Sequence, residues 1–92
     1  MKWTLRISSG YNDGVKAKVN PKEKRTYEGD FKEVVKKIEK EFFTEGDEVE
    51  VDPFDILTGW TRVWTLIRKL NYGEYRAILR LRPYDEVLDE DE

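Results

Sequence analysis

The sequence predicts a two-layer α/β sandwich, in which two helices pack on one face of a mixed four-stranded sheet. Stretches near both ends of the chain alternate apolar and polar residues, which is typical of half-buried strands. Two stretches in the middle repeat apolar residues at the spacing of amphipathic helices. Read in order, these stretches give the element sequence β-β-α-β-α-β. A chain of 92 residues is long enough for one such domain, which we expect to span residues 1–83.

The first twenty residues are expected to form a β-hairpin. Apolar residues alternate with polar ones in residues 2–7 and again in residues 15–19. Residues 9–14 lie between them and are rich in Ser, Gly, Asn and Asp, which favour tight turns. Pro21 ends this hairpin. Residues 22–28 are polar and are expected to form a loop, with a short extended piece around Thr26-Tyr27 as an alternative.

The next two elements are a helix and a short strand. Asp30 is a suitable N-cap for a helix whose apolar face carries Phe31, Val34, Val35, Ile38 and Phe42. Gly46 is suited to the C-terminal end of this helix. Residues 48–52 then alternate acidic residues with valine, which predicts a strand.

A second helix is predicted to begin at Asp52-Pro53, because an N-cap acid followed by proline is a typical helix start. Its apolar stripe continues to Leu70, and Asn71-Tyr72-Gly73 ends it. The Thr and Val content of residues 61–70 leaves an alternative, a strand that forms a hairpin with the next strand at residues 75–82. The helical interpretation requires a right-handed crossover between two parallel strands.

The composition favours a binding protein over an enzyme. The chain has no histidine and no cysteine, which excludes imidazole catalysis, thiol nucleophiles and zinc sites built from these residues, and no cofactor is predicted. No apolar run is long enough to cross a membrane, and a chain without disulfides suits the cytoplasm. Abundant mixed charge with no glutamine is typical of heat-adapted proteins.

A basic sheet face is the basis of one predicted function, nucleic-acid binding. If the apolar residues face the helices, the opposite face carries bases that could bind phosphates: Lys2, Arg6, Lys16, Lys18, Arg76, Arg80 and Arg82. Two features count against this function. Three acids of the third strand would lie on the same side, and Trp3 and Tyr75 point to the core, which leaves no aromatic platform for bases.

The charge of the chain is unevenly distributed. All 17 basic residues lie within residues 1–82, whereas residues 83–92 hold six acids and no base. Residues 84–92 are therefore expected to form an acidic, disordered tail. Such a tail could solubilise the protein or compete for its basic face.

The preferred function is a small, non-enzymatic binding or regulatory module that acts through protein contacts. The apolar arc of the predicted second helix is wider than a two-layer domain needs, so its flanks could contact another protein or a second copy in a homodimer. The residues chosen for this interface are Leu57, Trp64 and Leu66.

A third function, metal-dependent catalysis, would use a run of carboxylates. Glu48, Glu50 and Asp52 could hold a hard cation, with Asp55 close to them at the start of the next helix. No lysine lies between Glu41 and Lys69, and the chain has no histidine, so no base is at hand to activate water.

Overall fold

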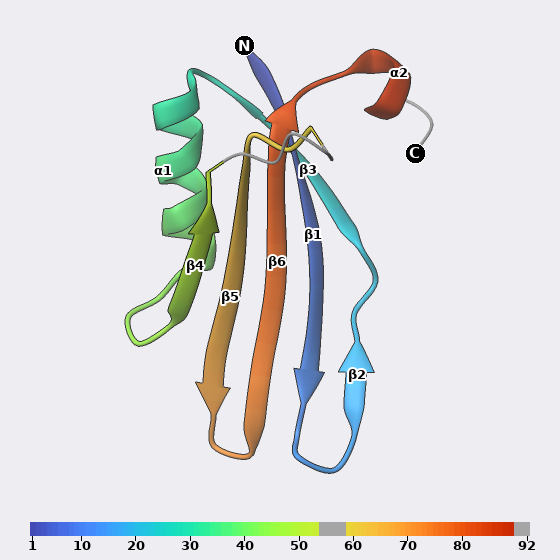
Figure 1. Cartoon of the computed structure of the whole chain (residues 1–92), viewed down its shortest axis with the longest axis vertical. Helices are drawn as coiled ribbons and strands as arrows, with labels where there is room; N and C mark the ends of the chain where they lie inside the picture. The colour runs from blue at the N-terminus through green and yellow to red at the C-terminus, as the bar shows by residue number, and fades with distance from the viewer. Residues whose placement is uncertain (54–58, 90–92) are drawn as a thin grey trace.

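The computed structural model describes residues 1–53 and 59–89 and shows one antiparallel sheet with a helix on one face (Figure 1). The elements are β1 (Lys2–Asn12), β2 (Ala17–Val19), β3 (Glu23–Glu28), α1 (Phe31–Phe42), β4 (Glu48–Asp52), β5 (Arg62–Leu70), β6 (Gly73–Pro83) and α2 (Glu86–Asp89). The strand order is β2-β1-β6-β5-β4. β3 also pairs with β1: β3 lies beside residues 2–7 of β1, and β2 lies beside residues 10–12. The sheet thus has β1 and β6 at its centre.

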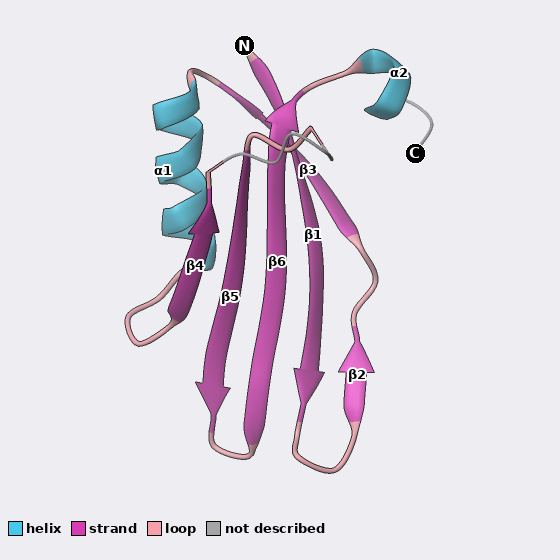
Figure 2. Ribbon diagram, in the orientation of Figure 1, coloured by secondary structure: helices cyan, strands magenta, loops and turns pink. Residues whose placement is uncertain are grey.

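The predicted fold class is wrong. The sheet has six strands instead of four, and every pairing is antiparallel instead of mixed. Within the described residues, α1 is the one long helix, and α2 is a single short turn beyond the end of β6 (Figure 2). In the described residues the fold is a sheet covered by α1, and β5 and β6 form an antiparallel hairpin in place of the predicted parallel crossover.

The error came from residues 61–70, where the alternative interpretation was correct. Trp64 and Leu66 point to α1, whereas Val63, Thr65 and Ile67 point to the opposite face, so both faces of β5 carry apolar side chains. Because both of its faces carry apolar residues, β5 reads as a nearly continuous apolar run, which a helical spacing also fits. Residues 54–58, the predicted start of this helix, lie outside the described residues.

Other local predictions are confirmed. β1 and β2 form the expected first hairpin, and β4 and β6 lie where strands were expected. Asp30 caps α1 by accepting a hydrogen bond from the Glu33 N–H at 2.9 Å. The helix ends earlier than Gly46 would suggest, with Phe43 as its C-cap. The loop predicted for residues 22–28 is wrong for most of its length, because residues 23–28 pair with β1 as β3; only the extended piece considered around Thr26-Tyr27 lies within this strand.

The hydrophobic core lies between α1 and one face of the sheet. It consists of Trp3, Leu5, Ile7, Val34, Val35, Ile38, Trp64, Leu66, Ala77, Leu79 and Leu81. Three residues of α1 enter this core, and the other members come from β1, β5 and β6. The hairpin ends of the sheet extend beyond α1 (Figure 1), and they expose Val15, Val19 and Tyr72. The opposite face of the sheet, called the open face below, carries no described helix except α2 at one end.

An ion pair fixes the turn between α1 and β4. Arg68 on β5 donates Nε and Nη2 hydrogen bonds to the two carboxylate oxygens of Asp47, both at 2.9 Å, and a third to the Phe42 carbonyl at 3.0 Å. The Asp47 carboxylate also accepts from the Thr44 N–H at 2.8 Å. The Arg68 hydrogen bonds outweigh the effect of burial and lower the Asp47 pKa from 3.8 to about 2. This pair joins the end of α1 to the sheet.

Replacement of Asp47 should remove a pH-dependent part of the stability. Because the pKa is lower in the folded state, the stabilisation is complete above about pH 4 and is lost as the pH falls through about 2. We expect Asp47→Asn to lower the free energy of unfolding by about 2 kcal/mol at pH 6. Urea unfolding at pH 6 and pH 2 checks this, with Glu45→Gln in the same turn as a control. An equal loss at both pH values would contradict it.

Gly73 is required by the approach of two hairpins. A Cβ at this position would overlap the carbonyl oxygen of Asn12, which lies on the paired strand β1. Backbone atoms cannot move away as a flexible side chain can, so Gly73→Ala should lower the free energy of unfolding by about 2 kcal/mol or more. Urea unfolding measures this loss. Asn71→Ala, in the same exposed turn, is the control and should change stability little; a similar small effect of Gly73→Ala would refute the clash.

Candidate functional site

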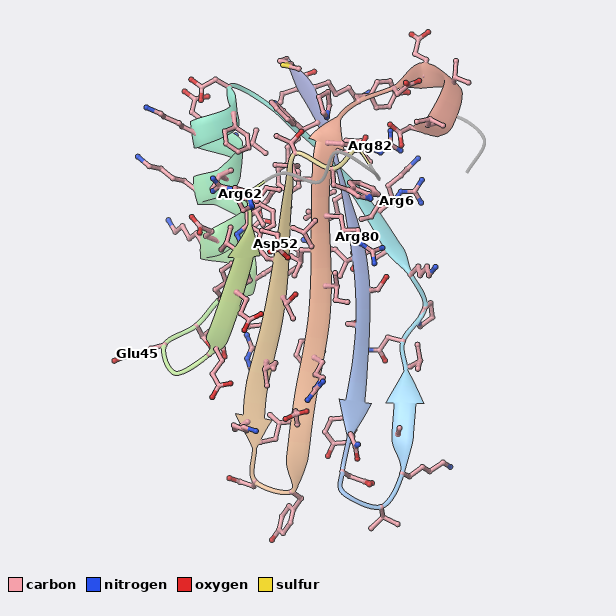
Figure 3. The ribbon with its side chains drawn as sticks, viewed as in Figure 1. Arg6, Glu45, Asp52, Arg62, Arg80 and Arg82 are labelled. Atoms are coloured by element: carbon pink, nitrogen blue, oxygen red, sulfur yellow. The ribbon has the colours of Figure 1, made fainter. Side chains whose placement is uncertain are left out.

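Four basic residues gather on the open face near α2. The register places Lys24 of β3 opposite Arg6 of β1, and Arg6 opposite Arg80 of β6. Arg82 lies two residues further along β6, opposite Thr4. Figure 3 shows the three arginines together at this end of the sheet. These residues, Arg6, Lys24, Arg80 and Arg82, are called the cation cluster below.

The row formed by Lys24, Arg6 and Arg80 is unfavourable for the sheet itself. Like charges directly opposite each other on neighbouring strands repel and destabilise the pairing. The next residue in the row, Val63 of β5, brings no compensating acid. Asp52 of β4 follows Val63 and is therefore separated from Arg80 by a whole strand. An anion bound above the row would remove this repulsion.

Asp89 of α2 supplies part of that negative charge. Its carboxylate accepts hydrogen bonds from Arg82 Nη2 at 2.6 Å and from the Thr4 hydroxyl at 2.9 Å. Arg6 Nη2 lies 3.8 Å from the same carboxylate, and Lys24 Nζ donates to the Asp89 backbone carbonyl at 2.6 Å. Asp89 is only 3% exposed, and Thr4 is fully buried beneath it. A buried carboxylate thus sits among three of the four cations.

The surroundings of Asp89 favour its charged form. Burial alone would raise the pKa of this carboxyl group. The Asp85 backbone N–H, the Thr4 hydroxyl and the charges of Arg82 and Lys24 outweigh the burial, so the pKa lies below its usual value of 3.8. Asp89 is therefore ionised at neutral pH, as a ligand of the cation cluster must be.

Arg80 differs from its neighbours in the cluster. Among residues 1–53 and 59–89, no residue forms a hydrogen bond or ion pair with the Arg80 side chain. Arg80 is half-buried at the edge of a hollow of about 270 Å³. The lining includes Arg6, Arg80, Arg82, Lys22, Glu23 and Trp60. The hollow has the charge and the guanidinium donors to hold a phosphate or carboxylate group.

An aromatic side chain stands beside these cations. The guanidinium carbon of Arg82 lies 5.2 Å from the centre of the Trp60 ring, which is a cation–π contact. A second hollow of about 450 Å³ is also lined by Trp60 and Arg82, together with Tyr84 and Leu88. The site therefore combines positive charge with aromatic surface in two hollows that share one Trp–Arg pair.

The structure brings together only some of the bases chosen from the sequence. Arg6, Arg80 and Arg82 belong to the cation cluster, and Lys2 lies nearby with its Nζ 4.2 Å from the Tyr84 ring. Arg76 is further along β6, paired with Glu74. The register pairs Lys18 with Tyr11, which puts it on the other face, and Lys16 precedes β2 in the turn.

Two of the three residues chosen for a protein interface, Trp64 and Leu66, are buried in this structure. Trp64 is fully buried, and Leu66 is 1% exposed. Both side chains pack against the core because residues 62–70 form a central strand instead of a surface helix. Leu57 lies outside the described residues.

The carboxylates of β4 do not gather into a metal site. Glu48, Glu50 and Asp52 alternate along the edge strand and share the open face. No group of three or more metal-binding side chains occurs within the described part of the chain. Asp55, the fourth carboxylate considered, lies outside it.

The sequence has no apolar run long enough to cross a membrane, and no described helix is long and apolar enough to do so.

Three residues of the site were missed in the sequence. Trp60 was assigned to a helical stripe, Lys24 to a loop, and Asp89 to a disordered tail. Thr26 and Tyr27, which both favour strands, were the local signal for the strand that carries Lys24. No local pattern could have shown that Asp89 returns to Thr4, 85 residues earlier in the chain.

The comparisons with known proteins give no relative. No family model, no curated protein and no solved structure matches this chain. The functional argument therefore depends on the cation cluster and its surroundings alone.

Two arginines of the cluster should respond in opposite ways to loss of charge. Arg80→Gln removes a repulsion from the row, so it should raise the free energy of unfolding by about 0.5 kcal/mol at low salt. Arg82→Gln removes a charged partner of buried Asp89, so it should lower the free energy of unfolding by about 2 kcal/mol.

Urea unfolding at low and high salt measures both effects. The gain from Arg80→Gln should shrink as salt screens the repulsion. A clear loss of stability in Arg80→Gln would show that Arg80 has a structural partner.

Proposed function

We propose that this protein is a non-enzymatic binding module that holds single-stranded nucleic acid on its open sheet face. The observation that carries the proposal is the row of cations formed by Lys24, Arg6 and Arg80. Asp89 contacts Arg6 and Lys24 of this row, whereas Arg80 forms no hydrogen bond or ion pair among the described residues, so an anionic ligand beside Arg80 would offset a charge that the described fold leaves uncompensated. The guanidinium donors of Arg80 form no hydrogen bond with the described residues, and Arg80 lines a hollow that it shares with Arg6 and Arg82.

The aromatic residues favour nucleic acid over other anions. Proteins that bind single strands combine a positive groove for the backbone with aromatic rings on which bases stack. The hollow with Arg6 and Arg80 fits the first requirement, and the hollow with Trp60 and Tyr84 fits the second. A sheet face without a helical cover leaves room for an extended strand.

The two other predicted functions have less support. The protein-contact function depended on Leu57, Trp64 and Leu66; Trp64 and Leu66 are buried, and Leu57 lies outside the described residues. Metal-dependent catalysis depended on carboxylates that do not converge in the described structure. The proposal therefore returns to the predicted nucleic-acid function. Trp60 supplies the aromatic surface that the sequence pattern did not place on this face.

Salt-dependent binding of a labelled oligonucleotide tests the proposal. We expect a 12-residue oligothymidylate to bind with an affinity that falls linearly in log salt. Arg80→Gln should weaken binding and reduce the slope by about 0.7, the contribution of one phosphate contact on a single strand. Fluorescence anisotropy gives both values.

Lys18→Gln is the matched control, because it removes the same charge from the opposite face. It should leave the slope nearly unchanged. Equal effects of the two substitutions would contradict a site on the open face. Binding of polyglutamate as tightly as the oligonucleotide would show that the ligand is an acidic polypeptide instead.

A further inference from the structure

The hold of α2 on the body is almost entirely polar. Val87 is 77% exposed and Leu88 is 57% exposed, so neither apolar residue of the helix packs into the core. Asp89 is the one side chain of α2 that is buried, and its partners are Thr4 and the cation cluster. Contacts of this kind exchange readily for another anion, whereas an apolar contact would not.

The contacts that hold the C-terminal segment change in kind at Asp85. Tyr84 is held by its N–H, which donates to the Lys2 carbonyl at 2.9 Å, and by the Lys2 ammonium over its ring. Beyond Tyr84, the Asp85 N–H donates to the Asp89 carboxylate at 2.9 Å, and the Asp89 N–H donates to the Asp85 carbonyl at 2.8 Å. These hydrogen bonds lie within the segment itself. Residues 85–89 can therefore leave the cluster as a unit while Tyr84 stays in place.

A phosphate on the cluster would use the same donors as Asp89. Arg6 and Arg82 line the hollow beside Arg80, and both contact the Asp89 carboxylate. A guanidinium group that is hydrogen-bonded to a carboxylate has fewer donors left for a phosphate. With α2 in place, Arg80 is the one arginine of the cluster without an anionic partner among the described residues.

We propose that residues 85–89 are a built-in competitor, in which Asp89 occupies the cation cluster until single-stranded nucleic acid displaces it. The inference rests on the proposed function and adds its regulation. Ligand affinity is then reduced by the fraction of molecules in which α2 is docked. Any event that weakens the Asp89 contacts exposes the full cluster.

Three substitutions in the full chain separate this competition from simple charge repulsion. Asp89→Asn removes the competing charge and should tighten oligothymidylate binding at least about tenfold. Thr4→Val removes a hydrogen bond to Asp89 without changing any charge, and should tighten binding about fivefold. Glu86→Gln removes an exposed charge from the same helix and should change the affinity less than about twofold.

The outcomes distinguish the two proposals. If wild-type binding depends on Arg80 but Asp89→Asn binds no tighter than Glu86→Gln, the competitor is refuted and the proposed function stands. If none of the proteins binds at low salt, both proposals fail. An unchanged affinity in Thr4→Val would also count against competition. Tighter binding by Asp89→Asn would then be explained by the loss of a repelling charge and not by the release of α2.

A measurement on the wild-type protein covers the case in which a variant does not fold. The Asp85 and Asp89 amide protons are hydrogen-bonded within the docked segment. Saturating oligothymidylate should speed their exchange with solvent at least about tenfold, because release leaves a short helix that is unstable alone. Unchanged exchange at saturation would show that ligand and α2 share the face without competing.

Discussion

Strands β1 and β6 pair antiparallel from Trp3 opposite Pro83 to Asn12 opposite Glu74, and this pairing joins the first and last strands of the sheet. It aligns Leu5 with Leu81 and Ile7 with Leu79 beneath α1, which gives the core its centre. On the open face, the same register sets Arg6 beside Arg80. Because side chains alternate between faces, a slip of one residue would bury the arginines and expose the leucines. Core and cation cluster therefore depend on one alignment.

The cation cluster shows a conflict between stability and binding. Arg82 and Arg6 are stabilised by Asp89, and they belong to the fold as much as to any site. Arg80 has no such partner among the described residues, and its positive charge repels that of Arg6 on the paired strand. A residue that weakens a fold and persists in a hollow is more readily explained by a ligand than by structure. The bidentate Arg68–Asp47 pair, on the face of the sheet that α1 covers, shows the purely structural case.

Short-range sequence patterns were sufficient to predict the elements whose structure depends on residues close together in the sequence. The first hairpin, the Asp30 cap of α1 and the alternation of β6 could all be predicted, because each depends on adjacent residues. The β5 segment could not, because it has apolar residues on both faces, and such a strand fits the spacing of a helix equally well. The arginines of β1 and β6 were found from strand parity, whereas Trp60 and Asp89 reach the site through long-range contacts that no local pattern records.

The incomplete cover provided by α1 gives the molecule a rigid end and a soft end. Near α2, the core and the Asp89 contacts hold the strands from both faces. At the other end, the β1–β2 and β5–β6 turns extend past α1 and have water on both sides. Backbone hydrogen bonds there open at a lower free energy than those above the core. Unfolding should therefore start at the turns and travel toward α2, so the cation cluster keeps its geometry while the far end of the same strands fluctuates.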